Sequence, residues 1–214
     1  MPGTAIKICG LSTPETVDAA LRAGASHVGL VFFPQSPRNV SIELAARLAA
    51  QARESAFVVG LFVDPASDLL EAVCGKVRLD AIQLHGNETP AETRRIREHH
   101  GLELWKAISV RRAADVATAD NYFDCADRIL YDAKSPPGSD LPGGNGLRFD
   151  WSLLSGASQR IPWILAGGLD PRNVGDAIRI TGAGFVDTSS GVESAPGVKD
   201  PGLITAFCEA VRAA

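Results

Sequence analysis

Eight short apolar runs, separated by longer amphipathic segments, constrain the fold of this chain more than any other feature. Their length and their β-branched or apolar content are typical of buried strands. The runs are Ala5–Cys9, His27–Phe32, Phe57–Val63, Ala81–His85, Glu103–Ser109, Arg128–Asp132, Trp163–Ala166 and Gly184–Thr188. Because helix-like segments separate them, the strands are expected to pair in parallel. Eight such units in 214 residues predict one domain, residues 1–214, with the α/β fold of a single (β/α)8 TIM barrel. An open doubly wound sheet is the alternative, because barrel closure is not visible in a sequence.

Helix start and stop signals fall between the runs. Thr13 before Pro14 is expected to cap the first helix, and Gly24 is expected to end it. Ser41 is expected to open the second helix, which Glu43–Arg53 continues. Further helices are expected at Ser67–Lys76, Pro90–His99, Arg111–Thr118, Phe149–Leu154, Pro171–Ile180 and Pro201–Ala213.

The net charge and the composition limit which classes of partner this chain is expected to bind. The formal net charge is −4 at pH 7, whereas a nucleic-acid-binding protein needs a basic face. The longest apolar run, Ala56–Val63, is shorter than the roughly 18 apolar residues of a membrane span, and no signal-like segment precedes Ala5. We therefore expect a cytoplasmic protein that binds neither nucleic acid nor membrane.

The cysteines are four in number, namely Cys9, Cys74, Cys125 and Cys208. None belongs to a CxxC pair or has a histidine at ligand spacing, so neither a cysteine–histidine metal site nor a disulfide framework is expected. Cys74 and Cys208 fall in helix-like segments and are interpreted as small buried hydrophobes. Cys9 differs, because it ends the first strand.

Period-2 alternation in the first strand places Lys7 and Cys9 on one side, and Ile6 and Ile8 on the other. If the isoleucines face the helices, Lys7 and Cys9 face the barrel axis. A free thiol titrates near a pH of about 8.5, and a neighbouring ammonium such as that of Lys7 favours the thiolate. Cys9 is therefore a candidate base, and a buried cysteine without chemistry is the alternative.

Three other strands end in polar residues as well. Gln83 and His85 share a face of the fourth strand, the sixth strand ends at Asp132, and Asp187 lies in the eighth. In barrels of this kind the chemistry gathers at the carboxyl ends of the strands. Asp132 is the candidate acid, because a partly buried carboxyl group can keep its proton. Capping of the turn after the strand is its alternative role.

Glycine-rich loops follow the seventh and eighth strands, where barrels often bind phosphate. Glycine lets backbone N–H groups approach an anion closely, and a helix N-terminus favours negative charge. The candidate phosphate-binding residues in these two loops are Gly167, Gly168, Ser189, Ser190 and Gly191. Ser189, Ser190 and Gly191 are expected to begin a short helix.

Two further loops carry candidate binding residues. Lys134–Leu147 is a long stretch rich in Pro and Gly after the sixth strand, and Gly144 and Gly146 within it are expected to form a third wall of the phosphate site. In the second loop, Pro34 and Pro37 stiffen the backbone around Arg38. A guanidinium on a stiff loop suits bidentate binding of a carboxylate, although a lone arginine is more often solvated.

Taken together, these motifs resemble phosphoribosylanthranilate isomerase, a family of tryptophan biosynthesis. The matching segments run in family order over the whole chain: Lys7–Leu11, Ser36–Arg38, Gln83–Gly86, Asp132, Gly143–Gly146 with Phe149–Trp151, Leu165–Leu169 and Asp187–Glu193. The resemblance implies a (β/α)8 barrel without metal or cofactor, acting on a phosphorylated sugar–anthranilate as a monomer or homodimer.

The resemblance also implies roles for the candidate residues. Cys9 becomes the general base and Asp132 the general acid of an Amadori rearrangement of N-(5-phosphoribosyl)anthranilate, an aminoaldose, to an aminoketose. Arg38 falls where the family holds the anthranilate carboxylate. Lys7, Gln83, His85 and Asp187 are expected substrate contacts. Two departures are the length of Lys134–Leu147 and Thr188, which stands where valine is common and is expected to be harmless because both residues are β-branched.

Three other functions are alternatives for such a barrel. The related isomerase of histidine biosynthesis uses an aspartate at the end of the first strand, where this chain has Cys9. Indole-glycerol-phosphate synthase relies on a lysine and glutamate set and usually carries an N-terminal extension. A catalytically silent phosphate-binding module would bind ligand without turnover, but both expected catalytic positions are filled here.

Overall fold

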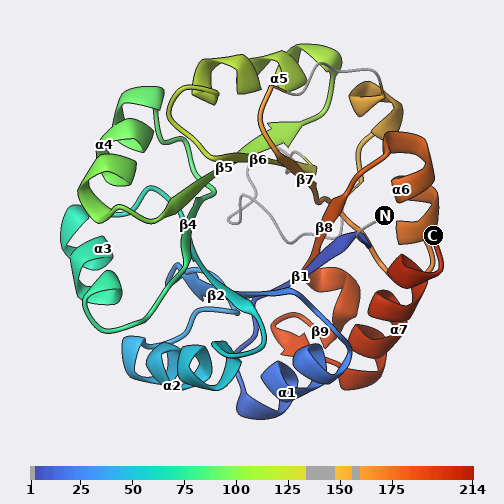
Figure 1. Ribbon diagram of the computed structural model, residues 1–214, viewed down its shortest axis with the longest axis horizontal. Coiled ribbons are helices and arrows are strands. Elements are labelled where there is room, and N and C mark those ends of the chain that lie inside the picture. Colours follow the sequence, from blue (N-terminus) through green and yellow to red (C-terminus); the bar gives the residue numbers. More distant parts are fainter. Residues whose placement is uncertain (1–2, 134–147, 156–159) are drawn as a thin grey trace.

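The computed structural model describes residues 3–133, 148–155 and 160–214. Eight parallel strands close into a barrel in chain order (Figure 1), which confirms the predicted fold and excludes the open sheet. The strands are β1 Ala5–Cys9, β2 His27–Phe32, β3 Phe57–Phe62, β4 Ala81–Leu84, β5 Glu103–Val110, β6 Arg128–Ala133, β7 Trp163–Leu165 and β8 Phe185–Thr188. Each strand lies where the sequence predicts one, with ends that differ by one residue at most.

A ring of helices surrounds the barrel (Figure 1). The α-helices of the described residues are α1 Pro14–Arg22, α2 Ile42–Ala52, α3 Ser67–Cys74, α4 Pro90–His100, α5 Ala113–Ala117, α6 Val174–Thr181 and α7 Pro201–Arg212. The predicted caps are confirmed for the first two helices, because Thr13 Oγ1 accepts from Thr16 N and Ser41 Oγ accepts from Leu44 N. Gly24 follows α1 with a φ of +81°, which favours glycine.

Two helix predictions need correction. The segment Phe149–Leu154 forms a 3-10 helix, η2 (Trp151–Leu154), in place of an α-helix, and Asp150 caps it by accepting a hydrogen bond from Ser152 N at 3.0 Å. Helix α6 begins at Val174 and not at Pro171, because Asp170 accepts from Arg172 N at 2.7 Å and folds the preceding residues into a turn.

Several short elements complete the described chain. The short helix expected to begin at Ser189 is a 3-10 helix, η3 (Ser190–Val192), which follows β8. The sequence did not predict the antiparallel hairpin of β9 (Glu193–Ala195) and β10 (Val198–Lys199) that comes next, nor the 3-10 helix η1 (Thr118–Tyr122) that continues α5. Elements of two to five residues are too short to show a hydrophobic period.

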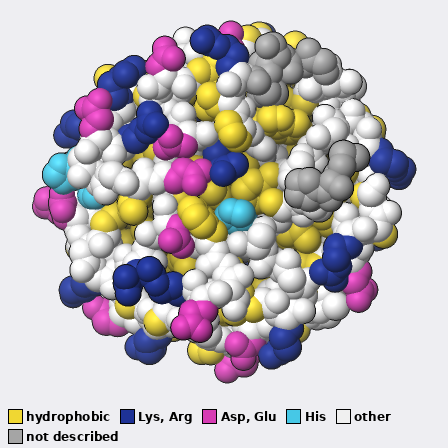
Figure 2. Space-filling model, viewed as in Figure 1, with side chains coloured by type: hydrophobic (Ala, Val, Ile, Leu, Met, Phe, Trp, Pro, Cys, Tyr) yellow, Lys and Arg dark blue, Asp and Glu magenta, His cyan; other side chains and the backbone are white. Residues whose placement is uncertain are grey.

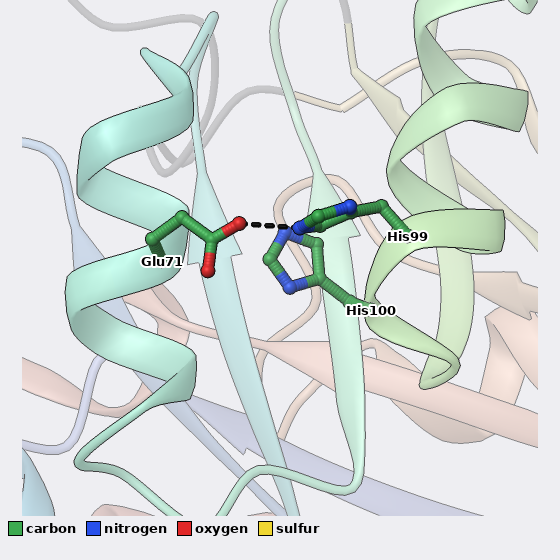
Figure 3. A group of neighbouring side chains, drawn as sticks. All are labelled: Glu71, His99 and His100. Atoms are coloured by element: carbon green, nitrogen blue, oxygen red, sulfur yellow. Dashed lines mark hydrogen bonds and ion pairs between the residues drawn. The ribbon is translucent and has the colours of Figure 1, made fainter.

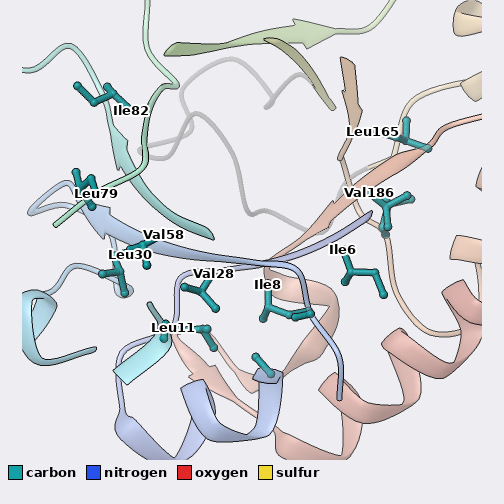
Figure 4. Packing of buried hydrophobic residues seen from close by; sticks show 14 of the residues in the cluster. Ile6, Ile8, Leu11, Val28, Leu30, Val58, Leu79, Ile82, Leu165 and Val186 are labelled. Carbon is teal, nitrogen blue, oxygen red and sulfur yellow. The ribbon is translucent and has the colours of Figure 1, made fainter. Parts of the chain in front are cut away.

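The main apolar core lies between the strands and the helices (Figure 4). Ile6 and Ile8 of β1 belong to it, as predicted, and both are buried. A second apolar cluster fills the barrel interior, with Trp105 and Phe185 as its largest side chains. Alternate residues of the strands therefore face two different cores.

An aromatic floor, which we define as His27, Phe57, Trp105 and Phe185, fills the interior near the amino ends of the strands. The His27 ring lies 5.3, 5.7 and 4.4 Å from the rings of Phe57, Trp105 and Phe185, measured between centroids. Burial, helped by the positive charges of Lys7 and Arg128, lowers the pKa of His27 to about 4. The floor fills the interior at the amino ends of the strands with packed rings.

On the outer surface, the face shown in Figure 2 has Lys and Arg side chains interspersed with Asp and Glu, mostly around the rim. Hydrophobic side chains gather nearer the centre of that face. Within the described ranges, no helix combines the length and the apolar character that crossing a membrane requires.

Candidate active site

A cavity opens at the carboxyl ends of the strands and encloses about 660 Å³, part of it open to solvent. This size suits a small organic ligand. Ten of the residues singled out from the sequence line it: Cys9, Arg38, His85, Asp132, Gly167, Gly168, Asp187, Ser189, Ser190 and Gly191. Val31, Phe33, Leu61 and Val63 add an apolar wall. Gly144 and Gly146 lie outside the described residues.

Lys7 lies beneath the cavity and is fully buried. Its Nζ donates a hydrogen bond to Asp187 Oδ1 at 3.0 Å, across the β1–β8 pairing in which the two residues are neighbours. Burial alone would lower the pKa of Lys7, but the charges of Asp187 and Cys9 outweigh burial and raise it. Lys7 is therefore a buried cation under the site and does not line the cavity, although the sequence placed it among the substrate contacts.

Cys9 ends β1 beside this ion pair and is 4% exposed. Burial raises the pKa of its thiol, and the nearby ammonium of Lys7 lowers it without cancelling the effect of burial. The sequence therefore predicted the direction of the Lys7 effect correctly but not the net result. Room for the thiol comes from Gly29 on β2, since a Cβ there would lie 2.9 Å from Cys9 Sγ.

A chain of hydrogen bonds links Gln83, His85 and Asp132. The Gln83 amide nitrogen lies 2.9 Å from His85 Nδ1, and His85 Nε2 lies 3.0 Å from Asp132 Oδ2. With the amide donating to Nδ1, Nε2 carries the hydrogen and donates to the carboxylate. Asp132 Oδ1 accepts from Ala133 N at 2.8 Å. Gln83 is fully buried and off the cavity wall, so it orients His85 and is not in contact with the cavity.

Arg38 reaches the cavity from the loop after β2 and is 5% exposed. Its Nε and Nη2 donate to the two carboxylate oxygens of Glu193 at 2.7 and 2.8 Å. The guanidinium therefore binds a carboxylate in bidentate geometry, but this carboxylate belongs to Glu193 of the chain itself and not to a ligand. Burial would raise the pKa of Glu193, but hydrogen bonds from Arg38 and Lys199 outweigh burial and lower it.

Lys199 of β10 completes this network, and the sequence did not predict it as a site residue. Its Nζ donates to Glu193 Oε1 at 2.6 Å, to Ser189 O at 2.9 Å and to Ser189 Oγ at 3.1 Å. The one available signal was the Pro196–Gly197 turn between two short segments, a hairpin pattern that brings Glu193 and Lys199 together.

The loops after β7 and β8 have backbone shapes that require glycine. Gly167 and Gly168 have φ values of +88° and +63°, and a Cβ on Gly167 would lie 2.6 Å from Ala133 N. A Cβ on Gly191 would lie 1.9 Å from Leu169 O. Backbone N–H groups can therefore line the cavity without side chains in between.

Two hydroxyl groups hold these loops in place. Ser189 Oγ donates to Cys9 O at 3.0 Å, and the helix predicted to begin near Ser189 is η3. Thr188 Oγ1 donates to Leu169 O at 2.7 Å, which joins the two loops. Valine is common at this position in the family that the motifs resemble, and valine cannot make this hydrogen bond. Thr188 therefore matches valine in shape but adds a hydrogen bond between the two loops.

Comparison with known proteins decides the family. Residues 6–210 match the family model described as "PRAI: N-(5'phosphoribosyl)anthranilate (PRA) isomerase". The chain belongs to the N-(5'-phosphoribosyl)anthranilate isomerase family. This result confirms the resemblance drawn from the motifs.

Similar isomerases come from several bacteria. The N-(5'-phosphoribosyl)anthranilate isomerase of Paramagnetospirillum magneticum is 53% identical over 207 residues, which cover 97% of this chain and 96% of the relative. That of Rhizobium meliloti is 51% identical over 211 residues, which cover 99% and 98% of the two chains.

Solved structures of the family have the same architecture. The phosphoribosyl anthranilate isomerase of Thermotoga maritima is 36% identical, with a TM-score of 0.88 and coverage of 99% of this chain and 100% of that one. An isomerase in complex with reduced 1-(o-carboxyphenylamino)-1-deoxyribulose 5-phosphate is 34% identical, with a TM-score of 0.85 and the same coverage. A further Thermotoga maritima structure, 35% identical with a TM-score of 0.84 and the same coverage, describes monomers generated from a dimeric isomerase.

Proposed function

We propose that this chain catalyses the Amadori rearrangement of N-(5'-phosphoribosyl)anthranilate to 1-(2-carboxyphenylamino)-1-deoxyribulose 5-phosphate in tryptophan biosynthesis. The observation that carries the proposal is one cavity that holds Cys9 and Asp132 together with two glycine-rich loops and a guanidinium. Such a cavity offers a base, an acid, and a binding group for each end of an anionic substrate.

Asp132 is the proposed acid. It gives its proton to the furanose ring oxygen as the C1–O bond breaks, and the lone pair of the anilino nitrogen forms the C1=N bond of an iminium ion. The hydrogen bonds from His85 Nε2 and Ala133 N, at 3.0 and 2.8 Å, fix the direction of the carboxyl group. An acid held in one orientation at the cavity wall lowers the entropic part of the activation barrier.

Cys9 is the proposed base. The thiolate removes the proton from C2, the C–H electron pair forms the C1=C2 bond of an enolamine, and tautomerisation at C1 and the C2 hydroxyl gives the ketone. Because burial raises the pKa of this thiol, its thiolate is a stronger base than an exposed one. The buried ammonium of Lys7, held by Asp187, offsets part of the effect of burial and so makes the thiolate easier to form than burial alone would allow.

The two ends of the substrate have separate binding groups. Backbone N–H groups around Gly167, Gly168, Ser190 and Gly191 are the proposed phosphate site, since these residues line one side of the cavity. Arg38 is the proposed partner of the anthranilate carboxylate, and its ion pair with Glu193 keeps the guanidinium aligned toward the cavity.

Further expectations complete the proposal. The chain works in the cytoplasm as one domain, as a monomer or a homodimer, and on a small phosphorylated substrate. Two proton-transfer groups are enough for the reaction, so the proposed mechanism uses neither a metal nor an organic cofactor.

The test follows the fluorescence of freshly made phosphoribosylanthranilate during turnover by the wild type, Cys9→Ala and Asp132→Asn. Loss of an acid or base typically costs about 10²- to 10⁴-fold in rate. Cys74→Ser, on α3 and outside the cavity lining, is the matched thiol control and retains activity. A wild-type protein that does not consume the substrate contradicts the function, and a nearly intact rate in either active-site variant contradicts the assigned role.

A further inference from the structure

Glu71, His99 and His100 form a cluster on the outer surface of the barrel, where α3 faces the end of α4 (Figure 3). Their potential ligand atoms all lie within 4.8 Å of one another. His99 Nε2 is hydrogen-bonded to Glu71 Oε1, and the His99 and His100 rings lie 4.8 Å apart at 87°. None of the three residues lines the cavity of the candidate active site.

Buried residues anchor the two helices that carry these side chains. On α3, Leu70 and Val73 are buried, and on α4 the buried residues are Thr93 and Ile96. Glu71, next to Leu70, is exposed on α3. Packing therefore fixes the two backbones, while the ends of the side chains remain free to adjust.

The position of the histidines favours a cation. His99 and His100 are the last two residues of α4, which ends at Gly101 with a φ of +63°. The carboxyl end of a helix carries a partial negative charge and stabilises positive charge nearby. The chain has four histidines in all, and two of them stand side by side here.

We propose that Glu71, His99 and His100 bind a divalent transition-metal ion, with zinc as the expected ion. Two imidazoles and one carboxylate are a common protein ligand set for zinc, and water fills the fourth position. Around a tetrahedral ion with bonds of about 2.0 Å, ligand atoms lie roughly 3.3 Å apart. Rotation of the exposed side chains closes the remaining gap, and the ion replaces the direct contact between Glu71 and His99.

The chemistry of the ligand atoms narrows the choice of ion. Two imidazole nitrogens and one carboxylate oxygen suit zinc and similar transition-metal ions. Magnesium and calcium prefer ligand sets made of oxygen atoms alone, so they fit this cluster poorly.

Such an ion joins helices that the chain places far apart, since Glu71 and His99 are 28 residues apart in sequence. No short ligand spacing in the sequence marks the cluster, because its members come from two different helices. Because a ligand that binds only the folded state stabilises it, we expect zinc to raise the thermal midpoint of unfolding. Rearrangement activity does not depend on the cluster.

The experiment is a calorimetric titration of zinc into the chelator-treated full chain at neutral pH. Wild type is compared with Glu71→Gln, His99→Ala and His100→Ala. Glu98→Gln is the matched control, because this exposed carboxylate neighbours His99 on α4 but is not part of the cluster. We expect a wild-type site that takes one ion per chain and loses affinity by about tenfold or more in each cluster variant, and not in the control.

A second measurement follows thermal unfolding with zinc and, in parallel, with magnesium. The proposal expects zinc to raise the midpoint of the wild type and of Glu98→Gln, with a smaller rise in the cluster variants and none from magnesium. It is overturned if the wild type binds no zinc, or if zinc binds equally well to the cluster variants, which would place the ion on a thiol such as Cys9. Turnover of phosphoribosylanthranilate by all variants separates this result from any failure of the proposed function.

Discussion

His85 Nε2 lies 3.0 Å from Asp132 Oδ2, although the two residues are 47 positions apart and their strands, β4 and β6, are not neighbours in the barrel. The hydrogen bond therefore crosses the interior in front of β5. Gln83 fixes the other ring nitrogen at 2.9 Å. The direction of the proposed acid thus depends on a histidine that depends in turn on a buried amide.

His85→Ala is expected to lower kcat by about 10- to 100-fold, because a hydrogen bond to a charged group contributes about 1.5–3 kcal/mol. KM should change little if His85 only orients Asp132. Steady-state kinetics measure both values. His85→Gln, which keeps a donor, should recover part of the loss, and an equal rise in KM would show that His85 binds substrate directly.

Lys7→Met is expected to raise the pKa of Cys9 further, because the Lys7 ammonium opposes the effect of burial. The pH at which iodoacetamide modifies Cys9 at half its maximal rate should move upward, with Cys9→Ala as the blank for the other thiols. Leaving Asp187 without its partner should also cost about 3–5 kcal/mol of stability. The double variant Lys7→Met/Asp187→Asn should regain stability but not activity, and an unchanged pH profile would contradict the electrostatic role of Lys7.

Gly29→Ala tests the space around the thiol. Its new Cβ would lie 2.9 Å from Cys9 Sγ, so the thiol must move and kcat should fall. Overpacking of this kind typically costs about 1–3 kcal/mol. Gly175→Ala in α6 is the control, because its Cβ would meet nothing closer than 3.9 Å. Wild-type kinetics in Gly29→Ala would argue against a fixed position for the thiol.

Glu193→Gln removes the charge that holds Arg38 and keeps the shape of the side chain. We expect KM to rise by about tenfold, because charge-assisted hydrogen bonds contribute more than neutral ones, while kcat changes little. Glu209→Gln on α7 exchanges an exposed carboxylate and serves as the control. A lower KM in Glu193→Gln would mean that Glu193 competes with substrate for Arg38.

The pKa of His27, lowered to about 4 from 6.5, predicts how stability depends on pH. Between these values the unfolded chain binds a proton at this position that the folded chain does not bind, so stability falls as pH falls from 6.5 toward 4. His27→Asn should make the free energy of unfolding less dependent on pH in this window, as measured by urea titration. The slope above pH 7 should be the same in both proteins.

Much of this architecture could be predicted because strands in a parallel barrel are buried on both faces and form continuous apolar runs. The polar residues that interrupt such runs, Lys7 and Asp187 among them, stand out for the same reason. The ion pair of Arg38 and Glu193 was hidden, since no local pattern joins residues 155 positions apart. The net direction of the pKa shift of Cys9 could not be predicted either, because it depends on how completely the fold removes water from around the thiol.

The aromatic floor has a consequence for substrate entry and product release. Trp105 and Phe185, whose ring centroids lie 5.7 Å apart, close the amino end of the barrel interior, so the cavity opens at one end. Product has to leave through the same opening by which substrate enters, so release of product must precede binding of the next substrate. We therefore expect product to inhibit competitively, and we expect a compound bound at the cavity opening to block both substrate entry and product release.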